Sequence, residues 1–252
     1  MPSGCRRFKV RCSSVFIATL LGTAMLAVPA LAQSVSLDLG QGGTLSNRVV
    51  QLVLLITVLS VAPGILLAVT SFTRIAVVLS LLRNALGTQQ APPNGVLISL
   101  AMFLSFFIMA PTFQTAWENG IKPFTEEQIT QEVAYERTAA PFRTFMLKNT
   151  RTSDLQLFVD ISKRTIASPA QTPMSVLVPA FMISELRRAF EIGFLLFLPF
   201  VIIDLVVSAI LMSMGMMMLP PVTISLPFKL VFFVLVDGWA LVAGSLVRSF
   251  TG

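Results

Sequence analysis

Long apolar runs along the chain are separated by one extended polar stretch. Four runs, at 49–69, 96–117, 192–212 and 222–247, consist almost wholly of apolar residues. Each reaches the ~20 residues that an α-helix needs to cross about 30 Å of hydrocarbon. The pattern predicts an all-α, membrane-associated protein in which these runs form two long helical hairpins. Residues 70–95 connect the first pair of runs, and residues 213–221 connect the second.

The polar stretch at 118–191 lies between the hairpins and carries sparse apolar residues. These recur at the i, i+3, i+4 spacing of a helix face. They are Phe142, Phe145 and Met146, followed by Leu155, Phe158 and Val159. We therefore expect a helical segment outside the membrane.

The first residues have the layout of a secretory signal. Four basic residues precede an apolar run at 15–28, and Ala30-Leu31-Ala32 follows as a small-residue cleavage site. The domain prediction is a cleaved signal peptide at 1–32, a lead-in at 33–48, a first hairpin at 49–117, a polar segment at 118–191 and a second hairpin at 192–252. An uncleaved signal anchor is the alternative, although the apolar run is short for a membrane span.

Composition supports a membrane protein and excludes several other classes. Hydrophobic residues make up 55% of the chain and charged residues 12%. Four of the 18 Lys and Arg residues lie in the predicted signal, so little basic excess remains for binding nucleic acid. Cys5 and Cys12 also lie there, and the chain has no histidine. We therefore expect no metal, no cofactor and no enzymatic activity.

The loop charges predict an orientation in the membrane. Arg74 and Arg83 lie between the first two runs without a nearby acid, and the positive-inside rule places them on the cytoplasmic side. The predicted signal sends the mature N-terminus to the periplasmic side, so an even number of spans returns the polar segment and the C-terminus to that side.

Two opposite charges lie inside the second pair of runs. Asp204 and Lys229 are equally distant from the turn that connects those runs, so antiparallel helices bring them to similar depth. An isolated charge is costly in such surroundings. The pattern predicts an intramembrane ion pair, either as a structural pin or with a part in transport.

The connecting turn of the second hairpin is rich in methionine. It contains Met214, Met216, Met217 and Met218, with Gly215 and two prolines to bend the chain. Methionine side chains are flexible and polarizable, so several copies of the turn could seal around a passing chain as a gasket. Ordinary packing against lipid or a neighbouring subunit is the alternative from composition.

Two further groups are candidates for assembly or gating. The charged residues Glu185, Arg187, Arg188 and Glu191 cluster before the third run, and we expect a solvated network between subunits. Phe145 and Phe158 fit a helix core by their spacing. In a ring assembly the same two residues are candidates for an aromatic constriction.

Three sequence signatures extend over most of the chain. The first is TSFTRI at 70–75 with LLRNALGTQQAPPN at 81–94. The second is PAFMISEL at 179–186 with FEIGFLLFLPF at 190–200. The third is MSMGMMMLPP at 212–221 with LPFK at 226–229 and VDGW at 236–239. In this order they resemble the FliP family of flagellar biosynthesis proteins. The resemblance extends from about residue 49 onward.

The resemblance implies a subunit of the flagellar type III protein export gate, in the bacterial inner membrane at the flagellar basal body. In that family several copies, understood as five, assemble with FliQ and FliR family proteins into a ring-like or helical channel entrance. Unfolded flagellar proteins pass through it, and FlhA and FlhB family proteins complete the apparatus. The resemblance also favours the gasket at the methionine-rich turn.

Two other classes of function fit parts of the pattern. A secondary transporter could use proline-broken helices and Asp204 for ion coupling. An intramembrane aspartyl protease could pair Asp204 with Asp237. Four spans are few for a carrier, and no Gly-x-Gly-Asp motif accompanies either aspartate.

Overall fold

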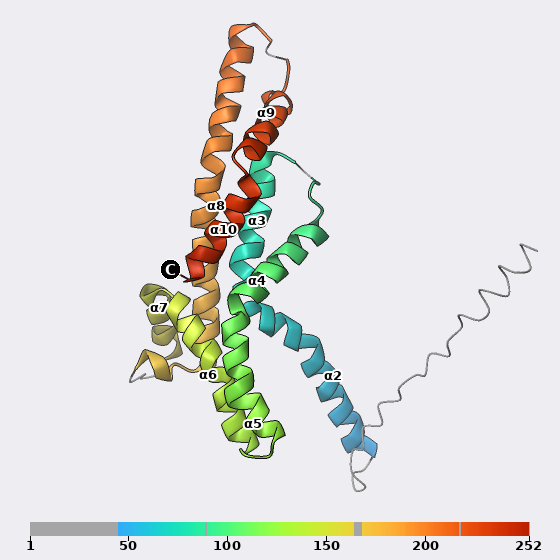
Figure 1. Cartoon of the computed structure of the whole chain (residues 1–252), viewed down its shortest axis with the longest axis vertical. Coiled ribbons are helices and arrows are strands. Elements are labelled where there is room, and N and C mark those ends of the chain that lie inside the picture. The colour runs from blue at the N-terminus through green and yellow to red at the C-terminus, as the bar shows by residue number, and fades with distance from the viewer. Residues whose placement is uncertain (1–44, 89, 164–167, 217, 252) are drawn as a thin grey trace, which may run out of the picture. The chain divides into compact units, whose positions relative to one another are not determined.

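A computed structural model describes residues 45–88, 90–163, 168–216 and 218–251 (Figure 1). Over these ranges the chain forms helices and no strands, which confirms the all-α prediction for the described residues. The predicted signal peptide at 1–32, most of the lead-in and Met217 lie outside them. The chain divides into two units between Leu54 and Leu55, and every tertiary contact given below belongs to the second unit.

The apolar runs become long helices. Three helical stretches have the length and composition to cross a membrane: α2 (Leu45–Ala68), α4 (Asn94–Ala116) with the turns that follow it, and α8 (Met174–Ser213). The pair α9 (Pro221–Leu235) and α10 (Gly238–Thr251) supplies a fourth if this bent pair counts as one span. Helix content and apolar length therefore agree with a multi-pass membrane protein.

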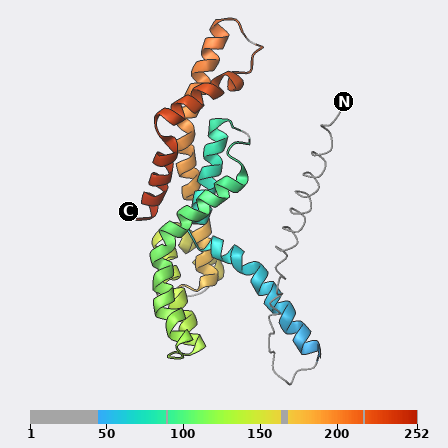
Figure 2. The ribbon, with the colours of Figure 1, turned by 45° about the vertical axis from the view of Figure 1, so that its right-hand side comes forward.

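The connection at 70–95 contains a buried helix that the hydropathy pattern missed. Helix α3 (Phe72–Leu86) ends at Gly87, whose φ of 77° is the left-handed conformation that glycine adopts readily. Ile75, Val78 and Leu82 on α3 are fully buried, and their spacing of three and four places them on one face. Helix α3 packs against α8 and α4 and forms the centre of the main hydrophobic core (Figure 2).

Helix α8 continues without interruption through the predicted border at 191/192. Its 40 residues extend roughly 60 Å, about twice the thickness of the hydrocarbon core of a bilayer. Pro179 and Pro199 lie inside it. Gly193 lets α8 approach α3 closely, because a Cβ at this position would lie 2.3 Å from Cδ1 of Leu81. The end of the polar stretch and the third apolar run therefore form one rigid element.

The fourth apolar run is bent and forms two helices. Helices α9 and α10 meet at an angle of 62°. Asp237 lies at the break with φ of 50°, a conformation that interrupts a helix. Gly238 follows it, and the Phe233 ring occupies the space that a side chain at 238 would need.

The polar stretch forms short helices. They are η1 (Trp117–Ile121), α5 (Lys122–Thr125), α6 (Gln131–Asn149), α7 (Thr152–Ser162) and η2 (Pro169–Gln171). Of these, α6 and α7 pack on the first half of α8. Met146 of α6 is fully buried in a small core with Leu177 and Phe181 of α8. The apolar spacing noted along 142–146 thus marks a face that packs within the chain.

Candidate functional site

Asp204 and Lys229 meet as the hairpin geometry suggested. Lys229 on α9 donates from Nζ to Oδ2 of Asp204 on α8 at 2.7 Å. The same Nζ donates to the backbone carbonyl of Ala85 at 3.2 Å, near the end of α3. The hydroxyl of Ser225 donates to Oδ1 of Asp204. The pair therefore joins three helices and not only the two arms of the hairpin.

The two partners differ in their access to surroundings outside the chain. The side chain of Lys229 is 5% exposed and that of Asp204 is 31% exposed. Both carboxylate oxygens of Asp204 are engaged by donors from α9. Asp237 lies at the α9–α10 break and is not among these donors or acceptors. The contacts of Asp204 thus form an ion pair and not the paired carboxylates that an aspartyl protease requires.

The methionine-rich turn presents apolar side chains to the outside of the chain. Met214 and Met216 are exposed, and Met218 is 99% exposed. Gly215 has a φ of 76°, so it supplies the left-handed bend that ends α8. Because their side chains are exposed, these three methionines can contact other chains.

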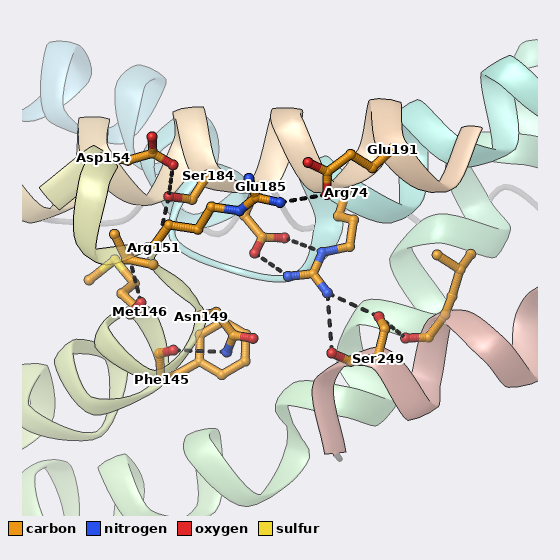
Figure 3. Close-up of polar contacts among 12 residues, drawn as sticks. Arg74, Phe145, Met146, Asn149, Arg151, Asp154, Ser184, Glu185, Glu191 and Ser249 are labelled. Atoms are coloured by element: carbon orange, nitrogen blue, oxygen red, sulfur yellow. Dashed lines mark hydrogen bonds and ion pairs between the residues drawn. The ribbon is translucent and has the colours of Figure 1, made fainter. Parts of the chain in front are cut away.

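Glu185 forms an ion pair that the sequence pattern did not reveal. Arg74 donates from Nε to Oε2 of Glu185 at 2.8 Å and from Nη2 to the other carboxylate oxygen (Figure 3). The exposed fractions of the two side chains are 1% and 0%. The expectation of a solvated position is therefore wrong for Glu185, and Arg74 is no loop cation. Of the two arginines in the 70–95 connection, Arg83 alone still indicates the cytoplasmic side.

The last turn of α10 completes the surroundings of Arg74. Its Nη1 donates to the hydroxyl of Ser249 at 3.0 Å and to the Ser249 carbonyl at 3.3 Å. The guanidinium carbon lies 3.6 Å from the centroid of the Phe250 ring, which is cation–π geometry. Every nitrogen of the buried guanidinium therefore has at least one hydrogen-bond partner.

Phe145 packs beside this cluster and Phe158 lies apart on α7. The Phe145 ring stacks on Phe250 and makes an edge contact with Phe181, each with a centroid distance of 5.9 Å. Phe158 is half-buried, and no ring contact joins it to Phe145 within the described ranges. The core role suggested by spacing holds for Phe145 in the single chain.

The remaining charges of the cluster before the third run lie at the surface. Arg151 at the start of α7 and Arg187 on α8 both bind the Glu191 carboxylate. Arg188 is half-buried. Figure 3 shows the Arg151–Glu191 contact near the buried pair. This group ties α7 to α8 within one chain, and its three arginines outnumber the single carboxylate of Glu191.

A second polar contact also joins α7 to α8. The Ser184 hydroxyl donates to Oδ2 of the buried Asp154 at 2.7 Å, and the Arg151 amide donates to the Ser184 oxygen at 3.1 Å. Asp154 was not identified from the sequence, because a carboxylate at the start of a helix is usually exposed.

The helical spacing of apolar residues after Arg74 could have predicted from the sequence that Arg74 is buried. Ile75, Val78, Leu82 and Leu86 follow at steps of three and four residues. That spacing predicts a helix with a buried face, and Arg74 adjoins that face. An arginine on a buried face requires an acidic partner.

Comparisons with known proteins assign the chain to a family. The profile of the FliP family matches residues 55–246. The chain is similar to the flagellar biosynthetic protein FliP of Caulobacter vibrioides, with 57% identity over 95% of this chain and 91% of the relative. It is also 51% identical to FliP of Agrobacterium fabrum, over 93% of this chain and 98% of that protein. It is 55% identical to FliP of Bacillus subtilis, over 81% of this chain and 93% of that protein.

Proposed function

Because this chain belongs to the FliP family, we propose that it is a channel-forming subunit of a flagellar type III protein export gate. The observation that carries the proposal is the family match, which includes both apolar helices flanking the methionine-rich turn. The names of the relatives support a role in flagellum assembly. Long apolar helices support a place in the bacterial inner membrane.

The proposed assembly contains several copies of this chain, five by the family resemblance. Its proposed partners are FliQ and FliR family proteins in the channel entrance and FlhA and FlhB family proteins in the rest of the apparatus. Exposed apolar side chains along α2, α4 and α9 support this view, because one chain cannot bury them. Lipid and neighbouring subunits would cover them together.

The proposed orientation keeps the polar segment and the C-terminus on the periplasmic side. Two observations support this orientation. They are the predicted signal peptide and Arg83 in the 70–95 connection. A reporter enzyme that is active only in the periplasm, fused after Gly252, tests this orientation. Inactive fusions in cells that still swim would contradict it.

The gate itself is proposed to form at the methionine-rich turn. Exposure of Met214, Met216 and Met218 supports this, because flexible apolar side chains from several copies can close around chains of different sequence. Phe145 and Phe158 are a weaker proposal for a second constriction, since the Phe145 ring already packs inside the chain. We propose that Glu185, Arg187, Arg188 and Glu191 serve assembly. Glu185 fixes α3 to α8 within each copy, and Glu191 fixes α7 to α8.

A clean deletion tests the proposed function. Cells without this chain should lose flagellar filaments and the export of flagellar subunits, while general secretion continues as in the parent. Expression of the intact chain from a plasmid is the control and should restore both. Normal swimming by the deletion strain would rule out the export-gate assignment.

Substitution at the turn tests the gasket separately. Replacing Met214, Met216 and Met218 by Ala removes the apolar bulk, so small solutes should leak through complexes that still assemble. Replacement by Leu keeps the bulk and should preserve most of the seal. Solute sensitivity of cells is measured beside the amount of complex recovered from them. A tight seal in the Ala variant at normal complex yield would contradict the gasket.

A further inference from the structure

An open groove of about 920 Å³ runs between the antiparallel helices α4 and α6, and Phe145 and Phe250 of the Arg74 cluster also line it. Each helix contributes positions separated by three or four residues, so one face of each helix lines it. The positions on α4 are Ile108, Pro111, Thr112 and Thr115, Asn119 follows on η1, and those on α6 are Arg137, Pro141, Thr144, Phe145 and Lys148.

Small side chains make this groove. Gly120 lets the turn after α4 approach α6 closely, because a Cβ there would lie 2.8 Å from the backbone nitrogen of Thr138. The Thr115 hydroxyl donates to the Pro111 carbonyl and the Thr144 hydroxyl to the Ala140 carbonyl. These hydroxyls are satisfied within their own helices. The walls therefore shape the groove but do not select a charge.

The selectivity for charge comes from two cations at the ends of the groove. Arg137 and Lys148 are exposed, and neither forms an ion pair with any residue that the structure describes. They are 11 residues apart on α6, roughly 16 Å along the helix axis. One phosphate or lipid headgroup cannot contact both. A protein segment with carboxylates spaced along it can.

Such a segment exists in the same chain. Glu126, Glu127 and Glu132, here called the acidic corner, are exposed around the turn between α5 and α6. No ion pair joins them to a cation within the described ranges. Glu132 lies about 140° around α6 from Arg137, at 100° per residue. Glu132 therefore points away from the groove of its own chain.

We propose that the acidic corner of one copy docks into the α4–α6 groove of the next copy. This contact uses two different surfaces and repeats head to tail, which is the kind of contact that closes into rings or extends into helices. Attraction of the acidic corner to Arg137 and Lys148 fixes the alignment of the two copies. The small side chains of the groove leave room for the turn between α5 and α6. The inference rests on the proposed function only in requiring that copies of this chain meet.

Cysteine cross-linking in membranes tests the contact, since Cys5 and Cys12 are the chain's only cysteines. In a chain with both replaced by Ser, Glu127→Cys with Thr144→Cys should give a ladder of dimers, trimers and larger species under mild oxidation. Each single variant should stop at dimers or monomers. Glu127→Cys with Ser153→Cys is the matched control, because Ser153 is exposed on α7 away from the groove.

Charge reversal tests the register in the same cross-linking variant. Arg137→Glu with Lys148→Glu should reduce the ladder by roughly five-fold or more, because two attractive contacts become repulsive. Glu126→Lys with Glu132→Lys should do the same. Combining the four reversals should restore most of the ladder, since the charges are complementary again.

Three outcomes would overturn the inference. They are a ladder equally strong in the Ser153 control, no ladder from complexes that assemble normally, and no recovery on combining the reversals. Loss of bound anionic phospholipid in the groove variants, without any ladder in the parent, would identify a lipid site in place of a second copy. Swimming is scored in the same strains: if the parent swims and gives no ladder, this contact is wrong while the export function stands.

Discussion

Helix α8 carries two carboxylates that each bind a cation from another helix, and their surroundings differ. Glu185 binds Arg74 with both side chains at 1% exposure or less. Asp204 binds Lys229 with the carboxylate 31% exposed. Both side chains of the first pair contact only protein groups, whereas the Asp204 side chain of the second pair is also partly exposed outside the chain. The cost of breaking a pair should therefore depend on which partner stays behind.

The two cations also differ in how their geometry is fixed. Arg74 uses a planar fork with two bonds to Glu185 and further bonds to α10. Lys229 has a single charged atom, which binds Asp204 and the Ala85 carbonyl. A guanidinium fork tolerates little rearrangement, while an ammonium group can find new acceptors. The buried pair should consequently be the less forgiving of the two.

Breaking the buried pair should have the largest effect. Arg74→Ala or Glu185→Ala leaves an unpaired buried charge and should cost about 3–5 kcal/mol of stability. Arg74→Lys should remain defective, because one ammonium group cannot replace the bidentate contact. The measurement is yield and thermal stability of the tagged chain in detergent. Arg187→Ala, at an exposed pair, is the control and should change stability by about 0–1 kcal/mol.

The hairpin pair should respond unequally to loss of its partners. Asp204→Ala leaves Lys229 buried and should cost about 3 kcal/mol, whereas Lys229→Ala leaves the half-exposed Asp204 with its Ser225 bond and should cost about half as much. Removing both should cost less than the sum. Complex yield and export rate in a double-mutant cycle measure this. Strict additivity would show that the two residues do not interact.

The Phe250 ring, which covers the Arg74 guanidinium, should contribute less to stability than either ion pair. Phe250→Leu keeps apolar bulk but removes the ring face, so it should cost about 1 kcal/mol. Phe228→Leu is the matched control, because Phe228 is exposed on α9. Thermal unfolding in detergent compares the two variants. Equal small shifts would mean that the ring contributes bulk and no attraction to the charge.

Two serine substitutions should separate the hydrogen-bond contributions to the two pairs. Ser225→Ala removes the donor to Oδ1 of Asp204 at a buried position and should cost about 1.5 kcal/mol. Ser249→Ala leaves its backbone carbonyl as an acceptor for Arg74, so about 0.5 kcal/mol is expected. Thermal unfolding of both variants measures the difference. The reverse order would show that Arg74 depends on the Ser249 hydroxyl more than on its carbonyl.

The hairpin pair could be predicted from the sequence and the buried pair could not. Asp204 and Lys229 are single charges in apolar runs joined by a short turn, so distance along the chain indicated their contact. Arg74 and Glu185 are separated by 111 residues. Glu185 also lies beside Arg187 and Arg188, where a carboxylate usually has local partners. Local sequence therefore favoured a surface network.

The sequence by itself determined the helical class, the long apolar elements and the flexible methionine-rich turn. These follow from periodicity, run length and residue type, which act over a few turns of chain. Only the tertiary structure decided that α3 is central, that α9 and α10 bend at Asp237, and that Glu185 is buried. The position of α3 and the burial of Glu185 depend on α3 packing against α8, more than a hundred residues away along the chain, and the bend depends on how Phe233 packs at Gly238. A buried charge selects its partner through such distant packing, because only there does the loss of water make pairing necessary.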